Sequence, residues 1–265
     1  MRFKKNFLHN YLINAPMALA IERSLECNIF SEQEFIPPIL DIGCGDGLFA
    51  HILFDGTINT GVDFNAKELK RAKSFKIYDE IINCHADKIP KDDSSYNTIF
   101  SNSVLEHIPN LKSVLSEVYR LLAPGGNFYV TVPTEKFDRF TILYQLFSLL
   151  HLSTAAQNYR RFFNKFWKHY NHYKIEKWEA IFKQAGFKVI TSKEYGSKVL
   201  CLINDFLVPL ALVSFVVKKI LNKWIIFRRL RGVYIYPFYF IISNIIKRYE
   251  NGSQRGLIFF SLAKE

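Results

Sequence analysis

The chain has 265 residues, 49% of them hydrophobic, and carries 35 Lys and Arg against 24 Asp and Glu, a formal net charge of +11 at pH 7. This length can bury a proper hydrophobic core, and one domain with an elaboration is the expected organisation. Its four cysteines form no Cys-x-x-Cys pair. Their scatter argues against a zinc site and a disulfide framework and favours a reducing compartment. Residues 1–10 are basic but lack the following apolar core of a secretory signal.

An N-terminal helical lead is expected over residues 1–35. The most informative stretch follows it at residues 39–47, Ile-Leu-Asp-Ile-Gly-Cys-Gly-Asp-Gly, where an apolar run ends in a carboxylate and three alternating glycines. The apolar run predicts a buried strand, and the glycines predict a strand-to-helix turn where the backbone can approach a ligand closely. A dinucleotide-binding turn would read G-x-G-x-x-G, whereas this one reads D-x-G-x-G-x-G.

Two further strand ends carry an acid. Residues 60–64, Thr-Gly-Val-Asp-Phe, predict a second strand that ends in Asp63. This acid lies twenty positions after Gly43, where such folds place a carboxylate against ribose hydroxyls. Residues 84–90 predict the end of a third strand, and Asp87 lies within them.

The next segments complete the first half of the chain. Residues 96–102 predict a fourth strand, and residues 104–108, Val-Leu-Glu-His-Ile, predict the loop and helix after it. Residues 117–126 predict a helix stopped by Pro-Gly-Gly before a fifth strand at residues 127–132.

In order and spacing these segments resemble the class I S-adenosylmethionine (SAM) methyltransferases with a type 11-like domain, over residues 36–135. The resemblance implies an α/β fold, with a Rossmann-like, seven-stranded, mostly parallel sheet, an antiparallel last strand and a helical insertion near the C-terminus. It implies SAM as the cofactor. The residues it implies for cofactor binding are Asp41, Gly43, Cys44, Gly45, Gly47, Asp63, Phe64, Asp87, Ser101 and Asn102.

The resemblance also implies a role for each acid. Asp41 is expected to fix the glycine loop and the amino-acid end of the cofactor, while Asp63 binds the ribose. Phe64 is expected to pack on the adenine, whose amino group Asp87 reads. Asp46 is interpreted as a solvated loop acid without a role.

His107 is the candidate catalytic base, because it follows the fourth strand close to where the family's methyl group sits and imidazole titrates near neutrality. The alternative is that this histidine only shapes the cofactor pocket. Ser101 and Asn102 are expected near the methionine portion of the cofactor.

The SAM-binding core is expected over residues 36–196, with a substrate-side insertion at 134–185. Within that insertion, residues 140–147 predict an apolar helix, and residues 160–168 alternate cations with aromatics; both are expected to line or cover the acceptor pocket. No metal is expected, because the two histidines of residues 169–173 have no adjacent acid or cysteine ligand. Residues 177–187 predict a late helix closed by Gly186, a backbone requirement.

Residues 197–250 are both apolar and basic. They hold nine cations against two acids, so they contribute +7 of the net charge, since 9 − 2 = 7. This combination favours an anionic membrane surface, or else a soluble cap with its aromatics in the core. Nucleic acid is disfavoured, because RNA-binding surfaces need solvated charge rather than long apolar runs.

A membrane-spanning hairpin is disfavoured as well. The apolar run at 199–217 includes Asn204, Asp205 and Pro209, and a span would carry the six cations of residues 218–231 across the bilayer. Residues 251–265 must also return to the sheet, since residues 256–262 predict a strand that the family resemblance makes the last, antiparallel one, beside residues 187–190. A helical pair lying in the membrane interface is the simpler interpretation.

The sequence thus predicts a SAM-dependent methyltransferase on the cytoplasmic face of a membrane, acting on a small-molecule or lipid-linked acceptor. O-methylation of a lipid-linked or surface-glycan intermediate is favoured, because the cationic and aromatic lid suits a phosphate-bearing head group. The alternatives are quinone-type C-methylation, methylation of a soluble small molecule, and a non-catalytic, membrane-docked binding protein. No oligomeric state is indicated.

Overall fold

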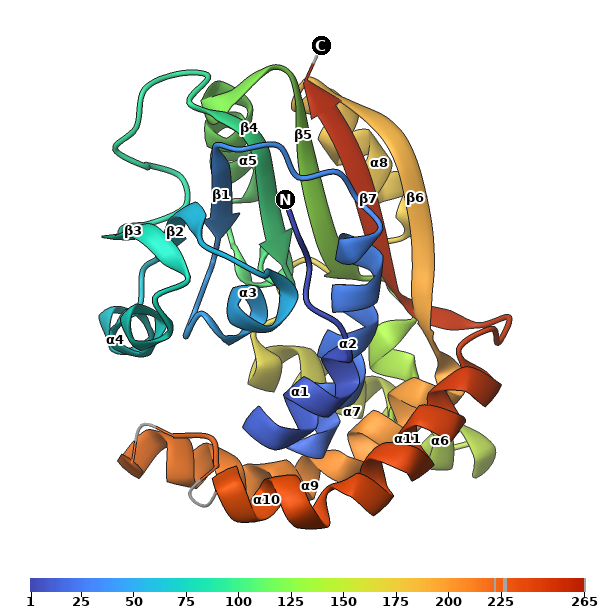
Figure 1. Cartoon of the computed structure of the whole chain (residues 1–265). Helices are drawn as coiled ribbons and strands as arrows, with labels where there is room; N and C mark the ends of the chain where they lie inside the picture. The colour runs from blue at the N-terminus through green and yellow to red at the C-terminus, as the bar shows by residue number, and fades with distance from the viewer. Residues whose placement is uncertain (222, 226–227, 265) are drawn as a thin grey trace.

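A computed structural model describes residues 1–221, 223–225 and 228–264, excluding the side chains of residues 228 and 229. Its centre is a seven-stranded sheet with the order β3-β2-β1-β4-β5-β7-β6 (Figure 1). The strands from β3 to β5 are parallel, and β7 is antiparallel to both of its neighbours. This confirms the predicted fold. The strands are β1 (Ile39–Ile42), β2 (Ile58–Asp63), β3 (Tyr78–Asn83), β4 (Tyr96–Asn102), β5 (Leu122–Pro133), β6 (Phe187–Ser197) and β7 (Arg255–Lys264).

β5 and β6 extend furthest beyond their predicted bounds. β5 starts at Leu122, so the Pro-Gly-Gly segment lies inside the strand instead of before it. β6 continues past residue 190 to Ser197. Its middle is polar and exposed because it is an edge strand with β7 as its partner. An apolar pattern therefore detects only its first residues.

Helices cover both faces of the sheet. The amphipathic α5 buries Leu111, Val114, Leu115, Val118 and Leu121, spaced three or four apart, against one face. One face is covered by α1 (Phe7–Asn14), α2 (Met17–Ser31), α3 (Leu48–Leu53) and α4 (Ala66–Phe75), and the other by α5 (Leu111–Leu121) and α8 (Ile175–Gln184). The helices α1 and α2 lie within the predicted N-terminal lead.

The end of α8 confirms the role predicted for Gly186. This glycine has φ +96°, a conformation that residues with a side chain rarely adopt. A Cβ there would also lie 2.8 Å from the Tyr119 ring. The glycine is thus a backbone requirement.

A layer of helices lies below the carboxyl ends of the parallel strands (Figure 1). It comprises α6 (Ile142–Leu149), α7 (Ser153–Trp167), α9 (Lys198–Leu221), α10 (Arg228–Tyr234) and α11 (Tyr236–Tyr249). Ligands of open α/β sheets bind at the carboxyl ends of the strands. The layer therefore faces the expected site.

Among the described residues, α9 is long and apolar enough to cross a membrane, by length and composition alone. It runs unbroken through Pro209. Instead of leaving the domain, it packs along α2. Asp205 accepts a hydrogen bond from Ile142 N at the start of α6.

Candidate cofactor and acceptor site

The turn between β1 and α3 contains Gly43, Gly45 and Gly47, with φ values of 75°, 53° and 75°. A side chain at Gly43 is excluded, because its Cβ would lie 2.5 Å from Val104 Cγ2. At Gly45 a Cβ would meet no described atom within 4 Å. The turn is thus tight at its base and open at its tip, as close approach of a ligand requires.

Asp63 ends β2 and is hydrogen-bonded to that turn. One carboxylate oxygen accepts from Gly45 N at 3.0 Å and the other from Asn65 N at 2.7 Å. Partial burial raises the pKa of Asp63, and these two N–H groups counteract the rise. Each oxygen keeps a second lone pair, so the carboxylate can still accept from a diol.

The two residues predicted for the adenine, Phe64 and Asp87, are both exposed. Phe64 is 69% exposed, and its ring stacks on His85 with centroids 5.8 Å apart and an interplanar angle of 7°. Asp87 is exposed and accepts a long hydrogen bond, 3.5 Å, from Ser113 Oγ. Both side chains are thus accessible to a ligand, and their roles toward the cofactor stay predictions.

Asp41 lies in the interior of the domain. Its Oδ2 accepts a hydrogen bond from the Tyr78 hydroxyl at 2.7 Å. Burial raises its pKa to about 7, although the Tyr78 bond opposes the rise. Cys44 is buried beside it, and burial raises the pKa of this thiol too. The roles of Asp41 and Cys44 toward the cofactor stay predictions.

Asp41 should make the stability of the cofactor-free protein fall with pH. Because its pKa rises from 3.8 in the unfolded chain to about 7, its contribution is fully present below pH 3.8 and is lost as pH rises through 7. Between pH 5 and pH 8, the free energy of unfolding of Asp41→Asn should therefore fall by about 2 to 3 kcal/mol less than that of the parent. Urea unfolding at both pH values measures this difference, and equal losses in the two proteins would contradict it.

Asp46, in the glycine turn, is a junction between the turn and the helical layer. Its Oδ2 accepts from Trp224 Nε1 at 2.8 Å, and pairs with Arg71 at 2.8 Å and with Lys218 of α9 at 3.4 Å. Lys218 also pairs with Glu68 of α4 at 3.1 Å. The carboxylate is 15% exposed. The interpretation of Asp46 as a solvated loop acid is therefore wrong.

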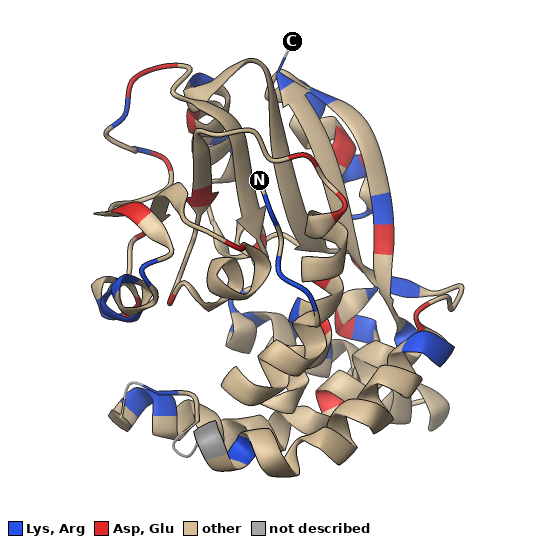
Figure 2. Ribbon diagram, in the orientation of Figure 1, with Lys and Arg blue, Asp and Glu red and all other residues tan. Residues whose placement is uncertain are grey.

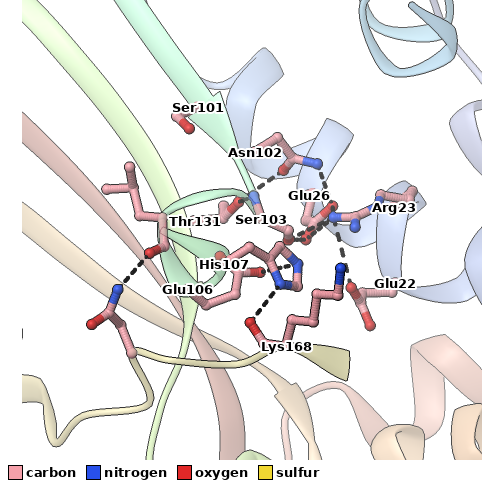
Figure 3. A network of polar contacts seen from close by, with 12 residues as sticks. Glu22, Arg23, Glu26, Ser101, Asn102, Ser103, Glu106, His107, Thr131 and Lys168 are labelled. Atoms are coloured by element: carbon pink, nitrogen blue, oxygen red, sulfur yellow. Dashed lines mark hydrogen bonds and ion pairs between the residues drawn. The ribbon is translucent and has the colours of Figure 1, made fainter. Parts of the chain in front are cut away.

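A buried polar network lies below β4 (Figure 3). At its centre, Glu26 of α2 accepts hydrogen bonds from Arg23 (2.6 and 2.9 Å), Ser103 (2.9 Å), Asn102 (2.9 Å) and Tyr195 (3.0 Å). Arg23 also donates to Ser103 Oγ at 2.6 Å. These donors give both oxygens of the fully buried Glu26 carboxyl hydrogen-bond partners.

The network includes one of the two residues predicted near the methionine portion. Asn102 donates to Glu26 and accepts from Thr131 Oγ1 at 2.8 Å. Ser101 is fully buried and donates to Ile42 O at 3.2 Å, which joins β4 to β1. The structure thus gives both residues contacts within the fold, and their contact with the cofactor stays a prediction.

His107 lies in the 3-10 helix η1 (Leu105–His107) and is 41% exposed. Its Nδ1 lies 3.3 Å from Lys168 O, which can only accept, so that nitrogen carries the proton of the neutral ring. Nε2 then has the free lone pair. Burial lowers the pKa of His107, and it lowers that of the neighbouring His169 to about 3. Both rings are therefore neutral at pH 7.

Glu106 is buried beside His107. Its Oε1 lies 3.7 Å from His107 Nε2, whereas its Oε2 has no hydrogen-bond partner among the residues that the structure describes. Burial raises the pKa of this carboxyl to about 8. A buried, unpartnered carboxyl is costly to a fold and therefore marks a functional-site candidate.

These groups line a cavity of about 360 Å³ between α2, η1 and α9. Its polar end has Glu22, Arg23, Glu106 and His107. Its remaining wall is mainly apolar and aromatic, formed by Phe137, Phe140, Phe163, Val208, Ala211 and Phe215. Lys218 and Trp224, which contact Asp46, also line it, so the cavity adjoins the glycine turn.

Glu22 and Glu26 of α2 and Glu106 were not predicted as site residues. A signal for the first two existed, because Glu22 and Glu26 stand four residues apart in a helix whose one other charged residue is Arg23. That spacing places both on one helical face. For Glu106 the sequence offered no signal beyond its place next to His107.

Comparison with known proteins agrees with this geometry. The model of a family described as methyltransferase domain matches residues 15–192. The sterol 4-C-methyltransferase of Caenorhabditis elegans is 34% identical over 44% of this chain and 38% of its own length. The ubiquinone biosynthesis O-methyltransferase of Klebsiella pneumoniae is 33% identical over 36% of this chain and 42% of its own. The chain thus matches less than half the length of these curated relatives.

Solved structures share the fold over nearly the whole chain. A SAM-dependent methyltransferase from Thermotoga maritima superposes with a TM-score of 0.55 at 12% identity, covering 94% of this chain and 92% of that one. Phosphoethanolamine N-methyltransferase 2 of Haemonchus contortus, solved with SAM, gives 0.51 at 20% identity, covering 97% and 56%.

Proposed function

Because this chain belongs to the methyltransferase domain family and shares its fold with a methyltransferase solved with SAM, we propose that it transfers the methyl group of SAM to an oxygen atom of an amphipathic acceptor at a membrane surface. The single observation that carries the acceptor class is α9, which lines the apolar cavity with one face and is exposed and apolar on the other.

The cofactor would lie along the carboxyl ends of β1 and β2. Its ribose hydroxyls would donate to Asp63 and its adenine would pack on Phe64. The amino group of the adenine would reach Asp87. The backbone of Gly45, open to solvent at the turn, would follow the methionine portion. The Glu26 network would close the site from below.

His107 would accept the proton of the acceptor hydroxyl at Nε2. The oxygen's electron pair would form the C–O bond with the methyl carbon while the C–S bond breaks. The bonding pair then stays on sulfur, giving neutral S-adenosylhomocysteine. The neutral ring and the Nδ1 contact to Lys168 O support this role, since they leave Nε2 unprotonated.

Replacing His107 by alanine should lower the transfer rate about 10² to 10⁴-fold, as loss of a general base does, with unchanged SAM affinity. Because burial lowers the pKa of this imidazole, the parent rate should decline only below pH 6.5. Rates of methyl transfer from tritiated SAM between pH 5 and pH 9 measure both effects. A fall in SAM affinity that accounts for the lost rate would instead make His107 a pocket residue.

Two helical faces of α9 support the membrane location. Cys201, Val208, Ala211 and Phe215 line the cavity. On the other face, exposed apolar side chains follow at spacings of three, four and seven, at Phe206, Leu210, Val213 and Ile220. A lipid acceptor could therefore move from the bilayer into the cavity along a single helix.

The neighbouring helices extend this apolar face. Exposed apolar side chains also occur on α6, α7, α10 and α11. The cations Lys219, Lys223, Lys247 and Arg248 are exposed as well. Figure 2 shows Lys and Arg toward both ends of this helical layer. Apolar side chains rimmed by cations suit an interface with anionic lipid head groups. We place the protein on the inner, cytoplasmic face of a membrane.

The names of two relatives favour a lipid acceptor, because one is named for sterol and another for ubiquinone biosynthesis. The second favours oxygen as the accepting atom. The first keeps a second candidate, methylation of carbon in a sterol-like or quinone-like ring. The two differ in their product, since an O-methyl ether and a C-methyl group give different proton NMR shifts.

A paired experiment on the full-length protein tests the proposal. Calorimetry measures SAM binding, and tritiated SAM with a lipid extract of the source organism measures transfer into an organic-soluble product. We expect micromolar SAM binding and label in the lipid fraction. SAM binding with label only in a water-soluble product would replace the lipid acceptor by a soluble one, and no SAM binding would contradict the enzyme.

A further inference from the structure

The polar end of the cavity contains both donors and acceptors of hydrogen bonds, and most donors are already used. Arg23 donates to Glu26 and Ser103. Lys218 pairs with Asp46 and Glu68. The cations at the cavity are therefore neutralised by protein carboxylates and are poorly placed to bind an anion.

The indole N–H of Trp224 also has a partner within the protein. Its Nε1 donates to Asp46 Oδ2 at 2.8 Å, and its ring lies 4.0 Å from Lys218 Nζ. Outside the cavity mouth, Arg160 of α7 donates to both oxygens of the buried Asp138, at 2.8 and 3.1 Å. The alternation of cations and aromatics in α7 thus includes an internal ion pair.

Three polar side chains at the same end have missing or long hydrogen bonds. Glu106 Oε2 and Asn204 Oδ1 are buried, and neither has a hydrogen-bond partner within the described part of the chain. Glu22 has long contacts, 3.6 Å to Arg23 and 3.4 Å to Asn204 Nδ2. All three residues line the cavity. Buried polar oxygens without partners cost about 1 to 3 kcal/mol each. Burial raises the pKa of Glu22 to about 7 and that of Glu106 to about 8, so near neutral pH these carboxyls can donate as well as accept. A hydroxyl group, which also does both, would recover the cost.

We propose that Glu22, Glu106 and Asn204 form a subsite for a hydroxyl group, so that the acceptor enters with a neutral hydroxyl at its reactive end and its apolar part along α9. This inference rests on the proposed function and deepens it. A phosphate in this subsite would bring negative charge into a buried site beside two carboxyls, where the nearby Arg23 and Lys218 are already paired with protein carboxylates. Any phosphate of the acceptor must therefore lie outside the subsite, toward the exposed cations.

Three probes with the same hexyl tail test the subsite: 4-hexylphenol, 4-hexylphenyl phosphate and 4-hexylbenzylamine. Each is titrated by calorimetry into the full-length protein, free and saturated with S-adenosylhomocysteine. We expect the phenol to bind at least about tenfold more tightly than the phosphate, the equivalent of one hydrogen bond to a charged group. The variant E22Q/E106Q should reduce this preference to less than about threefold.

Glu135→Gln is the matched control, since Glu135 also has a buried, unpartnered carboxylate oxygen but does not line the cavity. It should keep the parent's preference. Tighter binding of the phosphate, or an unchanged preference in E22Q/E106Q, would overturn the subsite. Tightest binding of the amine would assign an ammonium instead of a hydroxyl, and so overturn it too.

The result separates this inference from the proposed function. If SAM does not bind but the phenol is still preferred by the free protein, the proposed function fails and the subsite stands. If SAM binds and the phosphate is preferred, the subsite fails and the enzyme stands.

Discussion

Asp63→Ala should weaken SAM binding at least about 100-fold, the largest loss of cofactor affinity that we expect from one substitution. The carboxylate would lose its bonds to the ribose hydroxyls, and charged hydrogen bonds contribute about 1.5 to 3 kcal/mol each. It would also lose its bonds to Gly45 N and Asn65 N. The glycine turn would then no longer be held in its binding conformation. Calorimetric titration of SAM measures the effect.

Two matched variants interpret that result. Asp63→Asn keeps an oxygen for one of the two backbone N–H groups and should bind SAM with intermediate affinity. Asp79→Ala removes an exposed acid of β3 and should bind SAM like the parent. Parent-like affinity in Asp63→Ala would contradict the cofactor position proposed here.

The second large effect concerns the membrane. Replacing Phe206, Leu210, Val213 and Phe240 together by serine should lower partitioning to vesicles with anionic lipids at least about 100-fold. Each of these side chains is between 60% and 69% exposed, and burying one in an apolar medium contributes about 1.5 to 3 kcal/mol. SAM affinity should not change. Flotation with vesicles of phosphatidylglycerol and phosphatidylcholine measures partitioning.

The control replaces exposed apolar residues elsewhere. Ile36 precedes β1 and Ile190 lies on β6, and they are 43% and 50% exposed. Ile36→Ser/Ile190→Ser should float like the parent. If the parent itself stays with the soluble fraction at low salt, the apolar face belongs to a different interface, and the membrane location is wrong.

The sequence by itself could determine the sheet and the glycine turn. The strand at residues 96–102 has the predicted bounds, and the last strand returns antiparallel beside β6. The strand bounds and the glycine turn depend on patterns within about ten residues, such as apolar runs and glycines at fixed spacing, which limit the backbone locally. The antiparallel return of the last strand was implied by the family resemblance. Gly186 belongs here too, because a positive φ at a helix end favours glycine whatever lies around it.

Contacts between distant residues could not be predicted in this way. Asp46 looks like any loop acid, and only the return of the chain brings Lys218 and Trp224 to it, 172 and 178 residues later. The two faces of α9 follow the same rule. Apolar side chains occur on every side of this helix, and the tertiary structure decides which of them line a cavity and which are exposed.

Some residues of the candidate site could be predicted from the sequence, and others could not. Motif spacing placed Asp63, Phe64 and Asp87 after the carboxyl ends of β2 and β3, because the ends of neighbouring parallel strands meet at one edge of the sheet. Glu22, Glu106 and Asn204, whose hydrogen bonds are missing or long, lie on three separate elements, α2, η1 and α9. Whether a polar atom has a partner depends on groups far away in the chain, so only the tertiary structure could decide it.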